Sequence, residues 1–345
     1  MNTGNMRDEV REAPERVAAQ RAAIAPALHR LVGELRARPP AFAVTVARGS
    51  SDHAAGYARY LFETSLGLVT ASAAPSVVTG YGARLKLDGA LALAVSQSGQ
   101  SPDIVATLQA ARDCGARTVA LVNADDSPLA AAAEHVIPVA AGPERAIAAT
   151  KSFIASLSAM ASLVAAWTGD AALDTALDAL PGRLRAACAT DWSAARPVLR
   201  EARSLLVVGR GYALPVAQEM ALKGKEVCAL HSEPFSTAEL LHGPVALVDE
   251  GFPILLLAMS DATLDGVLAT ARQLREHGAH LLVASAVPEA LELADTPLPL
   301  PEPLHPMLDP IVAVQAYYPL IADVAVDRGL DPDRPRSLRK IVRTL

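Results

Sequence analysis

Residues 91–103 read LALAVSQSGQSPD, an apolar run followed by a polar loop and the signals of a helix start. The run 91–96 is short and continuously apolar, as expected of a strand that is covered on both faces of its sheet. After the loop, Ser101 is a favoured N-cap residue, Pro102 suits the first helical position and Asp103 suits the first turn. The stretch therefore predicts a strand–loop–helix unit of the kind that builds parallel α/β sheets.

The same alternation of strand and helix continues on both sides of this unit. In the first half we expect strands at 42–47, 67–71, 91–96, 118–122 and 136–139, separated by helices at 54–64, 102–114 and 127–134. In the second half we expect strands near 203–208, 227–230, 253–258, 280–285 and 296–300. Residues 6–38 and 150–167 are expected to form long helices. This pattern predicts the α/β class, with a doubly wound parallel sheet in each half and helices on both of its faces.

The two halves carry an internal repeat. Arg48 and Arg210 each follow the first strand of a half, at an offset of 210 − 48 = 162 residues, and the same offset relates Ser98 to Ser260. A repeat of this length corresponds to a domain rather than to a solenoid unit. We therefore predict an N-terminal helical segment (1–38), a first domain (39–168), a helical linker (169–198), a second domain (199–322) and a C-terminal tail (323–345).

Composition excludes several classes of function. The net charge is −6 with no long basic run, and aromatic residues make up 4% of the 345 residues, so a nucleic-acid partner is not expected. No apolar run approaches the roughly 18 residues of a membrane span. The start of the chain is too charged for a secretory signal, and the three cysteines form no CxxC pair. These features predict a cytoplasmic protein that does not bind a membrane.

The histidines and glycines give no sign of a bound metal or nucleotide. The eight histidines form no HxxxH or HExxH pattern, so we predict no metal site and no cofactor. The segment 142–153 lacks the Gly-Lys pair of a P-loop, and 209–211 lacks the third glycine of a dinucleotide fingerprint. No G-x-S-x-G elbow supports a serine hydrolase.

The loop between the strand at 91–96 and the next helix is rich in hydroxyl groups. A helix N-terminus with serine hydroxyls can bind an anion without a lysine, and ligands collect at the carboxyl ends of strands in open sheets. The alternative is a polar turn whose serines only cap the helix. The segment Arg48–His53 lies at an equivalent strand end, so it either adds hydroxyls to the same anion site or caps its own helix.

Titratable groups gather in the second half, between Glu219 and Pro244. Spacing alone predicts that Lys223 and Glu226 form a solvated pair on a helix surface. By the same reasoning His242, before Gly-Pro, is expected to be a turn residue.

Taken in order, these segments resemble the sugar isomerase (SIS) family, and more narrowly the isomerase domain of glucosamine-6-phosphate synthase and the free-standing glucosamine-6-phosphate deaminases. The resemblance runs from about Met6 to the C-terminus. The matching segments are 6–14, Ser96–Gly99, Pro143–Glu144 with Thr150–Phe153, Ala221–Glu226, Glu239 with His242–Pro244, and 333–340. The fold that this resemblance implies is two tandem SIS domains.

The resemblance also implies a role for each matching residue. The residues implied to bind the phosphate are Ser51, Ser96, Gln97, Ser98 and Ser101, with the backbone of Ile147 positioning the sugar chain. Glu226 would carry a proton between C1 and C2, and His242 would open the sugar ring from the neighbouring subunit of a homodimer. Lys340 would lie at the reacting end of the sugar, supported by Lys223.

Departures from the synthase narrow the expected reaction. We expect no glutaminase domain, because no cysteine precedes Cys114. Ala149 replaces a serine of the synthase pattern, and residues 148–153 are more similar to the deaminases. Arg339 replaces the usual small residue beside Lys340. The leading hypothesis is conversion of glucosamine 6-phosphate to fructose 6-phosphate and ammonia. The alternatives are another phosphosugar isomerase, a fructosamine-phosphate deglycase or, in a different class, a non-catalytic sugar-phosphate sensor.

Overall fold

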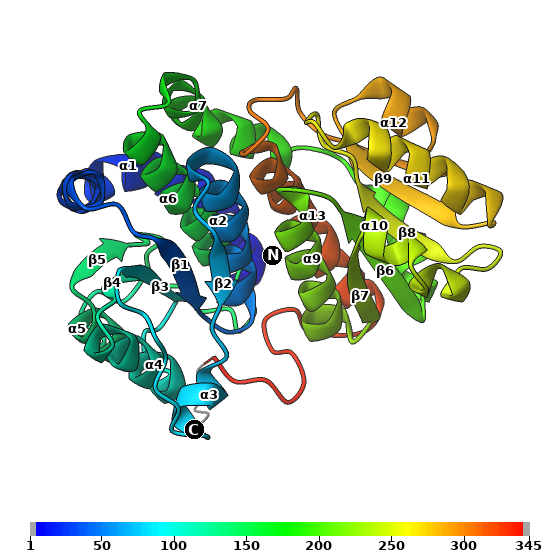
Figure 1. The fold of residues 1–345 in the computed structure, drawn as a ribbon. Helices are drawn as coiled ribbons and strands as arrows, with labels where there is room; N and C mark the ends of the chain where they lie inside the picture. The colour runs from blue at the N-terminus through cyan, green and yellow to red at the C-terminus, as the bar shows by residue number, and fades with distance from the viewer. Residues whose placement is uncertain (1–4, 341–345) are drawn as a thin grey trace. The chain divides into compact units, whose positions relative to one another are not determined.

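The computed structural model describes residues 5–340, which form two compact units (Figure 1). The first unit contains residues 15–144, 151–178 and 339–340. The second unit contains residues 5–14, 145–150 and 179–338. Two helices, α1 (Asn5–Ala37) and α7 (Ala171–Cys188), contribute residues to both units. The division predicted from the sequence, into five consecutive segments, stays a prediction.

The first unit is built on a five-stranded parallel sheet of order β2-β1-β3-β4-β5. The strands are β1 (Phe42–Val46), β2 (Thr70–Ser72), β3 (Ala90–Ser96), β4 (Arg117–Val122) and β5 (His135–Pro138). Every residue of the central strand β3 is buried, as its continuous apolar run predicts. Val44 is in register with Ala92, and Leu93 with Val119.

Helices cover both faces of this sheet (Figure 1). On one face α2 (Ser50–Leu66) packs against α6 (Lys151–Thr168). On the other face lie α4 (Pro102–Asp113), α5 (Pro128–Ala132) and the short α3 (Pro75–Thr79). On this second face, alternate residues of the strands pack against one side of α4. The strand residues include Val46, Ala92 and Ala94, and the helix residues include Ile104 and Leu108.

The second unit repeats this architecture. Its parallel sheet has the order β10-β9-β8-β6-β7, which is the arrangement of the first sheet with each strand replaced by its counterpart. The strands are β6 (Ser204–Gly209), β7 (His231–Ser236), β8 (Pro253–Leu257), β9 (His280–Ser285) and β10 (Thr296–Pro299). Two such sheets confirm the predicted α/β class with tandem domains.

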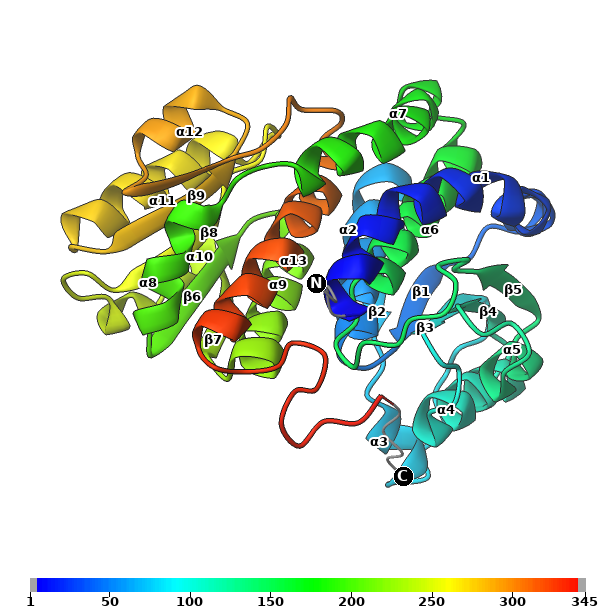
Figure 2. The ribbon, with the colours of Figure 1, turned by 180° about the vertical axis from the view of Figure 1, so that it is seen from behind.

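The helices of the second unit also lie on both faces of its sheet (Figure 2). On one face α9 (Ala213–Cys228) packs against α13 (Asp309–Asp327). On the other lie α10 (Thr237–Leu241), α11 (Leu264–Glu276) and α12 (Pro288–Glu292), whose apolar side chains meet β6, β8 and β9. Shorter elements are α8 (Arg196–Glu201) and the 3₁₀ turns at Ser193–Ala195 and Pro244–Leu247.

The strand predicted at 227–230 is wrong. α9 continues to Cys228, Ala229 takes a left-handed conformation with φ 48°, and β7 begins only at His231. Val227, Cys228 and Leu230 are buried, so the short apolar run belongs to the inner face of a helix end. Such a run cannot be distinguished from a buried strand by periodicity alone.

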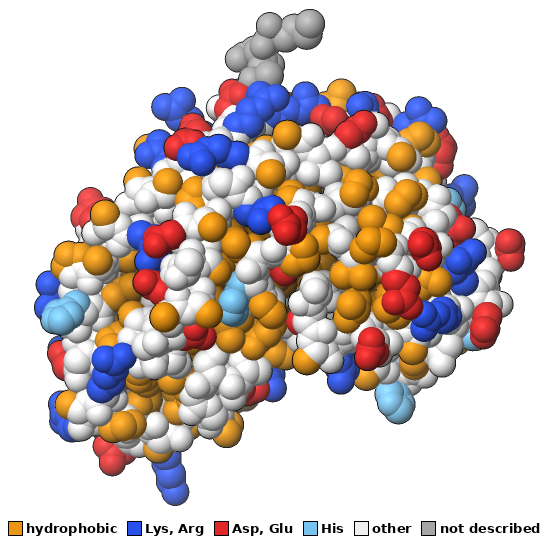
Figure 3. Space-filling view, turned by 90° about the horizontal axis from the view of Figure 1, so that it is seen from above, with side chains coloured by type: hydrophobic (Ala, Val, Ile, Leu, Met, Phe, Trp, Pro, Cys, Tyr) orange, Lys and Arg blue, Asp and Glu red, His pale blue; other side chains and the backbone are white. Residues whose placement is uncertain are grey.

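In each sheet the strand order reverses between two neighbouring strands, β1 and β3 in the first and β6 and β8 in the second. Loops that follow such strands flank a crevice where ligands of doubly wound proteins bind. In the first sheet these loops are Ala47–Gly49 and Gln97–Ser101. No helix among the described residues is long and apolar enough to cross a membrane. On the face drawn in Figure 3, acidic and basic side chains are interspersed.

Candidate functional site

A glycine fixes the shape of the serine loop, residues 96–101. Gly99 has φ 63°, its N–H donates to Ser96 Oγ at 3.0 Å, and its carbonyl accepts from Leu129 N at 3.1 Å. A Cβ at this position would lie 2.0 Å from Ser127 Oγ. Only glycine fits both the positive φ and this close approach.

The hydroxyls of the serine loop surround the start of α4. Ser101 holds the N-cap position, but its side chain makes no capping hydrogen bond. Its hydroxyl is therefore available to a ligand, in contrast to the reading in which the serines serve only as caps. Ser98 Oγ accepts from Gln100 N at 3.3 Å, and the side chains of Gln97 and Ser98 are half-buried. The loop can thus present hydroxyl donors to an anion at a helix N-terminus.

An ion pair joins the start of α4 to the loop after β1. Arg48, directly after β1, donates from Nε and Nη2 to Asp103 Oδ2 at 3.2 and 3.1 Å. Asp103 lies two residues after Ser101, and Ser51 lies in the first turn of α2, three residues after Arg48. The five side chains that the resemblance assigns to the phosphate thus lie in or beside the loops that follow two neighbouring strands, and their role in phosphate binding stays a prediction.

In the second unit a buried lysine lies between two carboxylates on one side of α9. Lys223 Nζ is 3.3 Å from Glu219 Oε1 and also donates to Glu226 Oε2. The side chains of Lys223 and Glu219 are fully buried, whereas Glu226 keeps 22% of its side chain exposed. Tyr318 of α13 donates to Glu219 Oε1 at 3.3 Å. The expectation of a solvated surface pair is therefore wrong, because α13 covers this side of α9.

The charge of this cluster is set by burial and by the two carboxylates. Burial by itself lowers the pKa of Lys223, but the attraction and hydrogen bonds of Glu219 and Glu226 outweigh it and raise that pKa above its ordinary value. Lys223 is thus an ammonium at neutral pH, and it holds the exposed carboxylate of Glu226 in one orientation. A fixed, accessible carboxylate of this kind can accept and return a proton.

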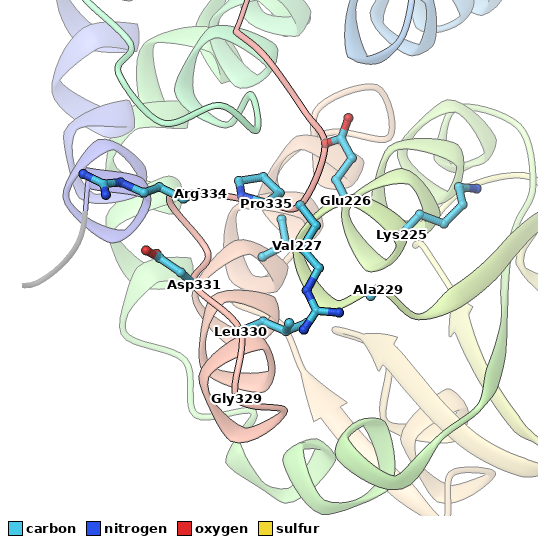
Figure 4. Close-up of a pocket in the computed structure, with 10 residues that line it drawn as sticks. Lys225, Glu226, Val227, Ala229, Gly329, Leu330, Asp331, Arg334 and Pro335 are labelled. Atoms are coloured by element: carbon cyan, nitrogen blue, oxygen red, sulfur yellow. The ribbon is translucent and has the colours of Figure 1, made fainter.

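A cavity of about 220 Å³ lies beside Glu226 in the second unit (Figure 4). Its wall includes the last turn of α9 and the chain after α13, with Arg334, Pro335 and Arg336. Lys225 also lines it, with Nζ donating to Ser232 O at 2.8 Å, and burial lowers the pKa of this lysine. The cavity therefore lies next to Glu226, whose carboxylate points away from Ala229 and Leu330 in Figure 4.

His242 is exposed and directly follows α10. The start of that helix is closed by Ser236, whose Oγ accepts from Glu239 N at 3.2 Å and donates to Glu239 Oε2 at 3.0 Å. Among residues 5–340, no hydrogen bond or ion pair joins the His242 ring to Glu226. The ring is accessible, and its role in ring opening stays a prediction.

Lys340 pairs with Glu144 in the first unit. Its Nζ lies 3.0 Å from Glu144 Oε2, and this fully buried carboxylate also accepts from Ser152 N and Oγ at 3.1 and 2.7 Å. The role predicted for Lys340 at the sugar's reacting end is untested.

Ile147 lies in a segment of the second unit that is held by Glu9. This buried carboxylate accepts from the backbone N–H groups of Arg145 and Ala146. The backbone around Ile147 is thereby fixed, which suits the positioning role that the resemblance implies.

Sequence reasoning missed the partners that hold these groups. Glu219 was signalled only by its i,i+4 spacing from Lys223, and Asp103 was assigned to helix capping although it pairs with Arg48. Nothing in the sequence signals the pairing of Glu144 with Lys340, which lies 196 residues away. The described residues contain no cluster of three His, Cys, Asp or Glu side chains that could hold a metal ion.

Both sheets are doubly wound, and in the first sheet the serine loop follows a strand at the point where the strand order reverses. This is the architecture of α/β proteins that bind ligands at the carboxyl ends of their strands. The SIS domain family model matches residues 43–166 and 198–301, one segment in each sheet. The chain belongs to the SIS domain family.

Known proteins support this assignment. The chain is 35% identical over 301 residues to the glutamine–fructose-6-phosphate aminotransferase (isomerizing) of Methanothermobacter thermautotrophicus, covering 86% of this chain and 50% of that protein. It thus spans about half the length of the curated relatives it matches. A Silicibacter pomeroyi structure, provisionally described as a phosphosugar isomerase, is 44% identical with a TM-score of 0.88, covering 95% of this chain and 99% of that one.

A second solved structure has the same fold at lower identity. It is the C-terminal domain of glucosamine-fructose-6-phosphate aminotransferase from Francisella tularensis. The chain is 26% identical to it with a TM-score of 0.88, covering 96% of this chain and 98% of that one.

Proposed function

We propose that this protein is a phosphosugar isomerase that acts on an amino sugar, converting glucosamine 6-phosphate and water to fructose 6-phosphate and ammonia. The observation that carries the proposal is the partly exposed carboxylate of Glu226, held by the buried ammonium of Lys223. The names of the matching relatives, which include a fructose-6-phosphate aminotransferase and a phosphosugar isomerase, support this substrate class.

In the proposed reaction, the serine loop binds the phosphate and Glu226 moves the proton. With the ring open, C1 is an aldehyde and C2 carries the amine. Glu226 removes the C2 proton, and the electron pair forms an enolamine between C1 and C2. Glu226 returns the proton to C1, while the C1 oxygen gains a proton and the amine nitrogen loses one, which leaves a C1 hydroxyl and an imine at C2. Water then adds to C2, and ammonia leaves.

Three residues would assist these steps. His242 would open the ring from the neighbouring subunit of a homodimer, because an imidazole can act as a general acid or base. Lys223 would keep Glu226 oriented, and Lys340 would contact the reacting end of the sugar after leaving Glu144.

The cavity beside Glu226 supports a second candidate, a deglycase that releases an amine from a fructosamine phosphate. Arg334 and Arg336 line the cavity and could attract an acidic substituent on the sugar nitrogen. Such an enzyme needs the same proton transfer, so only the released product separates it from a deaminase.

The test is to incubate the pure protein with glucosamine 6-phosphate, galactosamine 6-phosphate or a fructosamine phosphate, and to assay ammonia, amine and ketose phosphate separately. We expect equal amounts of ammonia and fructose 6-phosphate from glucosamine 6-phosphate. Amine release from the adduct alone would favour the deglycase. Saturable binding without any product would indicate a sensor.

A further inference from the structure

Arg48 is a charged residue at the serine loop that the proposed reaction leaves without a role. Its side chain is 55% exposed, whereas its partner Asp103 is 2% exposed. Nε and Nη2 both face Asp103 Oδ2, and Nη1 has no partner among residues 5–340. An arginine held along one edge presents its remaining N–H donors in a fixed direction.

The negative charge of Asp103 disfavours an anion at this helix N-terminus unless a cation neutralises it. Its buried carboxylate lies in the first turn of α4, where it would repel a second negative charge at the same helix N-terminus. Asp103 Oδ1 already accepts from Ile104 N at 2.9 Å, so the carboxylate also occupies one backbone donor of that turn. Arg48 neutralises Asp103 and adds donors that no serine supplies.

We propose that Arg48 binds the phosphate group of the substrate directly, with Asp103 holding the guanidinium in place. The inference rests on the proposed phosphate site and adds a residue to it. The position of Arg48 supports it, because the side chain leaves the end of β1, beside β3, and its contact with Asp103 fixes it at the start of α4. Arg48 would supply the full positive charge that hydroxyls and backbone N–H groups lack.

The experiment measures binding of inorganic phosphate and of fructose 6-phosphate by calorimetry in the full-length protein. We expect Arg48→Ala to weaken both ligands about ten- to hundredfold, as for the loss of a hydrogen bond between charged groups. Arg48→Lys keeps the charge but not the fixed pair of donors, so it should fall between wild type and Arg48→Ala. The matched control is Arg59→Ala, because Arg59 is 58% exposed and pairs with Glu63 at 3.1 Å on the same unit.

A double variant separates direct binding from mere neutralisation of Asp103. If Arg48 contacts the phosphate, Arg48→Ala combined with Asp103→Asn should stay as weak as Arg48→Ala. Recovery to the affinity of Asp103→Asn alone, or unchanged affinity in both Arg48→Ala and Arg48→Lys, would overturn the inference while leaving the proposed function intact. Failure of the wild type to bind either ligand would overturn both. If Arg48→Ala does not fold, Arg48→Lys decides the question, because it can still pair with Asp103.

Discussion

Lys223 illustrates how a single buried charge organises its surroundings. An isolated ammonium in a protein interior would lose its proton, but this one lies between Glu219 and Glu226. Glu219 is fully buried and is also bound by the Tyr318 hydroxyl. The result is a partly exposed carboxylate, that of Glu226, whose orientation is fixed by the Lys223 ammonium.

We expect Lys223→Met to destabilise the fold by about 3–5 kcal/mol, because it removes a buried cation that pairs with the buried carboxylate of Glu219. Urea unfolding measures this change. Adding Glu219→Leu should restore most of the loss, since a buried pair can be replaced by apolar groups at little cost. If Lys223→Met is as stable as wild type, the ion pair between Lys223 and Glu219 does not contribute to the stability of the fold.

Gly99 carries the conformation of the serine loop. We expect Gly99→Ala to cost more than the roughly 1–2 kcal/mol of a left-handed alanine, because its Cβ would also meet Ser127 Oγ at 2.0 Å. Phosphate binding should fall as the loop shifts. The matched control is Gly67→Ala, which has φ 61° and no atom within 4 Å of the new Cβ. Equal losses of stability in the two variants, measured by thermal unfolding, would contradict this account.

At the scale of elements, side chains from distant parts of the chain close the helix ends. Asp333 accepts from the backbone N–H groups of Asn5 and Met6 at the start of α1, at 2.8 and 2.7 Å. Arg328 donates to Cys228 O at the end of α9 and to the last carbonyls of α8. These contacts join the chain after α13 to the ends of three helices. Hydrogen bonds to helix ends therefore help to hold this part of the chain in place.

The pair between Arg196 of α8 and Asp327 of α13 makes stability depend on pH. Hydrogen bonds and the charge of Arg196 hold the pKa of Asp327 below its ordinary value of 3.8. A depressed carboxyl pKa stabilises the fold above the unfolded-state pKa, and this contribution is lost as pH falls through the folded-state pKa. Asp327→Asn should therefore lower stability at pH 7, and the difference from wild type should shrink as pH falls below 3.8 and through the lower folded-state pKa. A difference that stays constant with pH, followed by urea unfolding, would contradict the assignment.

Most elements could be predicted from the sequence because each is specified locally. The strand at 91–96 and the helix from 102 follow from a continuous apolar run and an N-cap, and both lie within one residue of their expected bounds. The strand at 227–230 could not be excluded, because the inner face of a helix end is as apolar as a strand. Local signals do not report which element covers another, and this is why the burial of Lys223 by α13 was missed.

At the scale of the whole molecule, the proposed site draws on residues far apart in the chain. The serine loop belongs to the first unit and Glu226 to the second. The prediction that they serve one reaction comes from the order of the segments that resemble the SIS family. The sequence could supply candidate site residues, because the family resemblance names them, and their roles stay predictions. It could not supply the partners that orient them, such as Asp103 for Arg48 and Glu144 for Lys340.

A shared site in a homodimer can be tested by complementation. We expect Glu226→Gln and His242→Ala to be inactive alone. If each site takes Glu226 from one subunit and His242 from the other, the co-expressed mixture should recover about a quarter of wild-type activity, since about half of its dimers are mixed and one of the two sites in each mixed dimer is intact. The measurement is ketose phosphate formation after co-expression. No recovery, with mixed dimers shown to form, would place both residues in the same subunit's site.

The most direct test of the central claim is proton transfer by Glu226 itself. A carboxyl proton exchanges with solvent while Glu226 holds it, so wild-type protein in D₂O should place solvent deuterium on part of the product carbon skeleton while it releases ammonia from glucosamine 6-phosphate. Glu226→Gln, which keeps the size of the side chain but cannot accept a proton, should bind fructose 6-phosphate with wild-type affinity, incorporate no deuterium and release no ammonia. Ammonia release and deuterium incorporation by Glu226→Gln at the wild-type rate would contradict the account.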